Sequence, residues 1–248
     1  MGYLKSDILR ISKSYHLYLG IFGVVFTLFF SLEGRGFENG SVVFTYVFVT
    51  NLSGMLLTYV FSALPFATVF CEDIEQKYLY CEVVRGNLKK YVLSKCAVIY
   101  ISSFITMLTG TILFLLICRT QIPWVNWDMT DLAIERAGCY GTLVENGYYM
   151  IYCILYASHL GMLSGWLSLM ASIGSIYISN KVLVLVLPIL WYQIANMVSG
   201  KGYGVQVFYA TIKMFENDWI NWGFILALSL ILAGITTKLI YIGLKQRI

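Results

Sequence analysis

The sequence predicts an all-α membrane protein with six transmembrane helices, an N-terminal interfacial helix and a short cytoplasmic surface helix. Three observations predict this class. The chain of 248 residues is 59% hydrophobic and only 12% charged, whereas soluble domains have about a quarter of their residues charged. Its mean hydropathy is +0.75. Several apolar runs reach the roughly 20 residues that a helix needs to cross a bilayer.

Six apolar segments account for most of the chain. The polar segments between them are too short for a separate soluble domain, so we predict a single transmembrane domain over residues 1–248. "SNK" at 179–181 predicts a tight turn between the fourth and fifth helices, and Pro188 is expected to kink the fifth. The predicted spans are 17–32, 45–70, 91–118, 149–178, 182–199 and 219–241.

Charge orients this set of spans. With the N-terminus inside, the inner segments hold 12 of the 17 basic residues but only five of the 13 acidic ones. The inner side then carries a net charge of +7 and the outer side −3. Because basic residues concentrate on the cytoplasmic side of membrane proteins, we expect both termini to be cytoplasmic.

Residues 3–14 are expected to form an interfacial helix. Leu4, Ile8 and Ile11 recur at helical spacing, with charged residues around the rest of the wheel. Such a helix lies in the membrane surface with its apolar face toward the lipid. The alternative is an ordinary polar tail.

The most unusual stretch is 70–95, which holds nine of the 30 charged residues between two apolar runs. Acidic residues at its start and Arg85 near its end suit the helix dipole, and they predict a surface helix over 74–85. Gly86 fits the position that stops a helix, and Asn87 is a good N-cap for the next one. The sequence therefore predicts a helix, a sharp break and a second helix.

A capped surface helix is more than a simple connection requires. We interpret it as a docking element for a cytoplasmic partner, with Tyr78, Leu79 and Glu82 as anchors and Arg85 as an orienting charge. A membrane-surface helix with no partner is the alternative.

The same stretch carries a motif. After the second span comes an acidic "F-x-E-(D)-x-E" segment, then the short helix, then "RG-x-x-x-x-Y-x-x-x-K" leading into the third span. This pattern resembles the membrane subunits of type-2 ABC exporters, the six-helix permeases. Many members have a glycine after the acidic residues, where this chain has Gln76 and Lys77. The resemblance rests on Phe70, Glu72, Glu75, Arg85, Gly86, Tyr91 and Lys95.

The resemblance implies a specific role for the chain. The surface helix would be the coupling helix, seated on a cytoplasmic ABC ATPase subunit, and two permease chains, identical or different, would pair in a bacterial plasma membrane. ATP and Mg²⁺ would bind the ATPase, because this chain has no G-x-x-x-x-G-K-[ST] motif. The cargo would be an amphipathic or lipid-like substrate such as a peptide or drug. The expected ATPase-coupling residues are Glu72, Glu75, Tyr78, Leu79, Glu82 and Arg85.

Other candidate residues lie in or near the spans. Ala157, Gly161 and Gly165 form a small-residue stripe that allows close helix packing. His159 is an ionisable group within a span, where a functional role and a simple hydrogen bond to a neighbouring helix are both open. Cys118 and Cys139 fall on the outer side, so a disulfide between them is possible.

No catalytic, metal or cofactor site is expected on this chain, and its partners would be protein and lipid rather than nucleic acid. The six cysteines show no CxxC spacing. Ser164 and His159 lie five apart on one helix, without the G-x-S-G pattern of intramembrane serine proteases. A non-ABC channel or carrier and a membrane immunity or scaffold protein remain as alternatives.

Overall fold

The computed structural model describes residues 3–12, 14–32, 40–78, 87–126, 132–199 and 204–247. These residues contain no β-strand. The helices are α1 (Tyr3–Ser12), α2 (Tyr15–Ser31), α3 (Val42–Thr50), α4 (Met55–Ala63), α5 (Val69–Glu75), α7 (Leu88–Gln121), α8 (Ala133–Ala137), α9 (Gly141–Glu145), α10 (Tyr149–Tyr177), α11 (Lys181–Ser199), the 3₁₀ helix η1 (Gly204–Phe208) and α12 (Asp218–Arg247).

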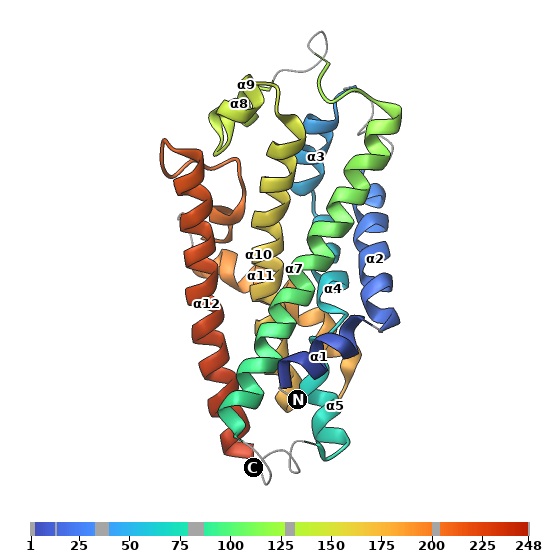
Figure 1. Ribbon diagram of the computed structural model, residues 1–248, viewed down its shortest axis with the longest axis vertical. Helices are drawn as coiled ribbons and strands as arrows, with labels where there is room; N and C mark the ends of the chain where they lie inside the picture. Colours follow the sequence, from blue (N-terminus) through green and yellow to red (C-terminus); the bar gives the residue numbers. More distant parts are fainter. Residues whose placement is uncertain are drawn as a thin grey trace.

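Four helices in the described part of the chain are long and apolar enough to span a membrane: α7, α10, α11 and α12. This is the architecture of an all-α membrane protein. The long helices run roughly along one axis, and both termini lie toward the lower end in Figure 1, opposite α8 and α9. The predicted interfacial helix corresponds to α1, and its Ile11 is buried.

Helix α10 is the centre of the bundle. In its most apolar window 72% of the residues are buried, against 11% for α11. It packs against α7, α12, α11 and α4. The other helices therefore surround α10, and their outward faces carry exposed apolar side chains such as Phe22 and Phe26 on α2.

The second predicted span, 45–70, is not one straight helix. Helices α3 and α4 are separated by a short break and bent by 79°. The residues between them are Asn51, Leu52, Ser53 and Gly54, of which three are poor helix formers. Asn51 also turns its amide back to the carbonyl of Val47, at 2.8 Å, and so satisfies a backbone acceptor near the end of α3.

The break also allows a close helix contact. A Cβ on Gly54 would lie 2.1 Å from Oγ of Ser31 at the end of α2. Glycine has no Cβ, and this allows α2 to approach the break closely. The first predicted span, 17–32, corresponds to α2, whose 17 residues form a shorter apolar helix than the four long ones.

Buried serines join three helices inside the bundle. Oγ of Ser103 on α7 lies 2.7 Å from Oγ of Ser164 and 2.8 Å from Oγ of Ser168, both on α10. Ser164 also donates to Oγ of Ser62 on α4, at 2.6 Å. Hydroxyl groups buried among apolar helices need such partners, and here they supply them to one another.

Candidate functional site

A buried ion cluster lies at the end of the bundle that holds both termini. Its centre is Lys95 on α7, whose Nζ is 2.9 Å from Oδ1 of Asp7 and 3.2 Å from Oδ2 of Asp73. These side chains are 4%, 9% and 3% exposed. The hydroxyl of Tyr91 donates to Oδ2 of Asp73 at 2.6 Å. Three helices, α1, α5 and α7, are therefore joined by one buried ammonium group.

The local sequence explains this geometry. Tyr91 and Lys95 are four residues apart, so they lie on the same face of α7. Helix α7 begins at Leu88 because Oδ1 of Asn87 accepts the N–H of Lys89 at 2.9 Å, which confirms the predicted N-cap. This start places Lys95 in the second turn, where its buried charge requires a partner.

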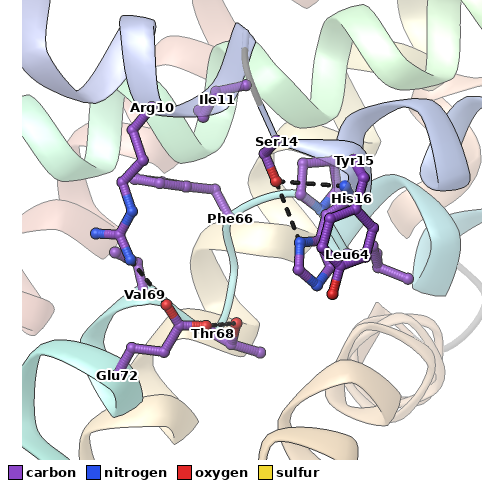
Figure 2. Close-up of a pocket in the computed structure, with 11 residues that line it drawn as sticks. Arg10, Ile11, Ser14, Tyr15, His16, Leu64, Phe66, Thr68, Val69 and Glu72 are labelled. Atoms are coloured by element: carbon purple, nitrogen blue, oxygen red, sulfur yellow. Dashed lines mark hydrogen bonds and ion pairs between the residues drawn. The ribbon is translucent and has the colours of Figure 1, made fainter.

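Further ion pairs lie beside the Lys95 contacts. Nη2 of Arg10 is 2.9 Å from Oε2 of Glu72, and Figure 2 shows this arginine reaching from α1 to α5. Nζ of Lys181, at the start of α11, lies 3.6 Å from Glu72 and 3.9 Å from Glu75. These groups are partly exposed, and each such pair contributes only about 0–1 kcal/mol. They nevertheless bring the start of α11 into the cluster.

A thiol adds a contact between α5 and the turn before α11. Sγ of Cys71 donates to the carbonyl of Ser179 at 3.0 Å. Burial and the nearby Glu75 carboxylate raise the pKa of this thiol. Cys71 therefore serves here as a neutral hydrogen-bond donor.

The start of the predicted helix 74–85 needs correction, while its residues 79–85 lie outside the described residues. Residues 74 and 75 belong to α5, which ends at Glu75. Lys77 then has a φ of +56°, the left-handed conformation that L-residues rarely adopt. This backbone reversal stops α5, so a helix cannot run through it from Ile74.

The predicted coupling residues fall in three places. Glu72 and Glu75 lie on α5 and contact Lys181, within the chain itself. Tyr78 is described and is 44% exposed. Leu79, Glu82 and Arg85 lie outside the described residues, as does Gly86.

The motif includes Tyr91 and Lys95, but sequence reasoning did not identify the carboxylates that Lys95 contacts. Asp7, one of the charged residues expected around the helix 3–14, is buried against Lys95. Asp73 and Arg10 were not named as site residues. A signal was present, because Lys95 lies inside an apolar run and a buried lysine needs a carboxylate. The sequence did not say which of the five inner carboxylates it was.

The small-residue stripe on α10 faces α7. A Cβ on Gly161 would lie 2.9 Å from the ring of Phe104, and a Cβ on Gly165 would lie 2.8 Å from the ring of Tyr100. Ala157 is fully buried. The two glycines thus allow aromatic side chains of α7 to lie directly on the α10 backbone.

The end of the bundle that holds α8 and α9 contains the remaining candidates. Nε2 of His159 lies 2.7 Å from the hydroxyl of Tyr140, which directly precedes α9 and does not belong to a neighbouring long helix. Cys118 and Cys139 are both free and buried. Cys139 donates to the carbonyl of Ile212 at 2.8 Å.

Within the described residues, no three histidine, cysteine or acidic side chains are grouped as metal ligands would be. Comparison with family models, with curated proteins and with solved structures found no match to this chain. The cluster connects α1, α7, the start of α11 and the helix α5, which leads toward residues 79–86.

Proposed function

We propose that this chain is the permease subunit of an ATP-driven exporter of the type-2 ABC class. Two such chains, identical or different, would pair in a bacterial plasma membrane and associate with separate cytoplasmic ATPase subunits. Together they would move an amphipathic or lipid-like substrate outward. ATP and Mg²⁺ would bind only the ATPase.

The observation that carries this proposal is the cluster around Lys95. The segment expected to contact the ATPase begins just after α5, and α5 is bonded to α7 through Asp73 and Lys95. It is also bonded to α1 through Arg10, and to the start of α11 through Lys181. A push on this segment would therefore reach an interfacial helix and two long apolar helices together. A simple surface linker does not need such a connection.

The backbone at Lys77 supports the same reading. Its φ of +56° is one that glycine adopts without steric cost. Many of the permeases that the sequence resembles have a glycine at this point. The chain thus departs from the motif in residue type while adopting a backbone conformation that glycine would favour.

The proposal includes six spans with both termini cytoplasmic. Besides the four long helices, α2 would form the first span and the bent pair α3–α4 the second. Single cysteines at positions 38, 130 and 205 should then react with an impermeant reagent from outside, while one at position 82 should be protected in intact cells. Labelling at position 82 would overturn this topology.

A secondary carrier is the second candidate, and the broken span favours it. Carriers often use interrupted helices to bind substrate near the middle of the membrane. However, the break at 51–54 contains amide and hydroxyl side chains and no carboxylate. Coupling to protons or sodium ions by a carboxylate at this point is therefore not available.

Purification separates the two candidates. A tagged chain extracted in mild detergent from its native host should bring an ATPase with it, at a ratio near one to one. Export should also stop when the catalytic glutamate of that ATPase is replaced. Purification of the chain alone, with transport that continues without ATP, would contradict the exporter and favour the carrier.

A further inference from the structure

A polar cavity of about 280 Å³ lies beside the ion cluster, between α1, the start of α2 and the segment before α5. Figure 2 shows its two sides: Arg10 and Glu72 on one, Ser14 and His16 on the other. Phe66 lines it as well, with its ring centre 5.9 Å from Cζ of Arg10. The cavity therefore combines opposite charges with hydroxyl, imidazole and aromatic groups.

The charged groups of this cavity retain hydrogen-bonding capacity. Arg10 has five N–H donors and Glu72 about four lone pairs. Their contacts with each other, of Arg10 with Asp73, and of Glu72 with Thr68 and Lys181 use only part of them. The Arg10 side chain is 46% exposed and that of Glu72 is 26% exposed. A ligand that carries both an anion and a cation could thus bind both without breaking the pair.

An apolar groove lies between α1, α2 and α7. It is lined by Ile8, Leu17, Val98, Ile101, Ser102 and Ile105, and by Ile11, which also lines the polar cavity. Ile105 and Ile101 lie on α7 and are 43% and 48% exposed. A polar cavity and an apolar groove that share a residue match the two parts of a phospholipid.

We propose that this pair of cavities binds one membrane phospholipid with a zwitterionic phosphoethanolamine headgroup. The phosphate would accept hydrogen bonds from Arg10, and the ammonium group would donate to Glu72. One acyl chain would lie in the groove between α1 and α7. An anionic lipid fits less well, because its net charge would face the Glu72 carboxylate.

The choice of ethanolamine over choline follows from hydrogen bonding. An ammonium group has three N–H donors for the Glu72 carboxylate, and a quaternary amine has none. Glu72 already pairs with Lys181, so an ammonium group at this place resembles a contact that the protein itself makes. The lipid site is independent of the proposed export function, since it needs no ATPase.

Native mass spectrometry of the full chain tests this site. The protein would be exchanged into nanodiscs of equal parts phosphatidylethanolamine, phosphatidylcholine and phosphatidylglycerol with one acyl composition, and then released. We expect one retained lipid per chain, with phosphatidylethanolamine favoured about tenfold because hydrogen bonds to charged groups are strong. Preferential retention of phosphatidylglycerol or phosphatidylcholine, or of no lipid, would overturn the proposal.

Variants locate the retained lipid. Ile105→Trp fills the apolar groove without touching the ion cluster, and it should reduce retention about tenfold. Ile117→Trp is the matched control, because Ile117 lies on the same helix, is also 43% exposed and does not line the groove. Equal retention by the two variants would place the lipid elsewhere and refute this site. Glu72→Gln should remove the preference between headgroups, because the Glu72 carboxylate is the group that distinguishes them.

Discussion

Nζ of Lys95 lies 2.9 Å from Oδ1 of Asp7, although 88 residues separate them in the chain. Asp73 contacts the same ammonium group at 3.2 Å. Two carboxylates therefore share one buried cation, and Arg10, 3.7 Å from Asp73, supplies a second positive charge. Helix α1 is thus joined to α7 by a buried ion pair.

Replacing Lys95 with methionine should strongly destabilise the fold. The variant leaves Asp7 and Asp73 buried without their shared cation, which costs about 3–5 kcal/mol when one partner of a buried pair is lost. Lys90→Met, at an exposed position on the same helix, should change stability by less than about 0.5 kcal/mol. Unfolding of the purified proteins in detergent measures both, and equal stabilities would contradict the cluster.

Replacing Lys77 with glycine should stabilise the protein. The left-handed conformation costs an L-residue about 1–2 kcal/mol, and the greater freedom of glycine in the unfolded chain offsets part of this gain. We expect a net gain of about 0.5–1 kcal/mol in the free energy of unfolding. Lys77→Ala is the control, because alanine keeps the same steric penalty, so a gain with alanine would argue against the conformation.

Replacing Gly165 with alanine should destabilise the contact between α10 and α7. The added Cβ would lie 2.8 Å from the ring of Tyr100, and overpacking of this kind costs about 1–3 kcal/mol. Gly223→Ala on α12 is the control, since nothing lies within 4 Å of a Cβ there. Thermal unfolding should distinguish the two variants, and a neutral Gly165→Ala would show that the stripe does not pack as described.

Cys139 should resist thiol reagents from outside at neutral pH. Burial raises its pKa to about 11, so the reactive thiolate is scarce near pH 7 and becomes more abundant as the pH rises toward 11. Labelling by an impermeant maleimide should therefore be slow at pH 7, faster at pH 9 and rapid after denaturation. Rapid labelling of the native protein at pH 7 would contradict the buried position.

The sequence predicted the long helices better than the site. Long apolar runs predicted the helices that became α7, α10, α11 and α12, because hydrophobicity is a local property. The break at 51–54 was missed because it is only four residues long and the segments on both sides of it are apolar. The carboxylate partners of Lys95 were missed because the cluster joins α1, α5 and α7, and no local pattern indicates which carboxylate meets which lysine.

The motif residues themselves were informative. Tyr91 and Lys95 were singled out by the resemblance, and both contact Asp73. Glu72 and Glu75 were expected to face a partner, yet they contact Lys181 in the same chain. A pattern in sequence thus located the right region, whereas the direction of each contact depended on the packing of distant helices.

The central claim is that the segment after α5 attaches this chain to an ATPase. The double variant Tyr78→Ala and Leu79→Ala tests it most directly, because neither residue lies in a predicted span. The measurement is the amount of ATPase that copurifies with the tagged chain from mild detergent. We expect the variant to reach the membrane at the wild-type level and to lose most of its ATPase. An equal amount of ATPase on both proteins, with export at the wild-type rate, would contradict the account.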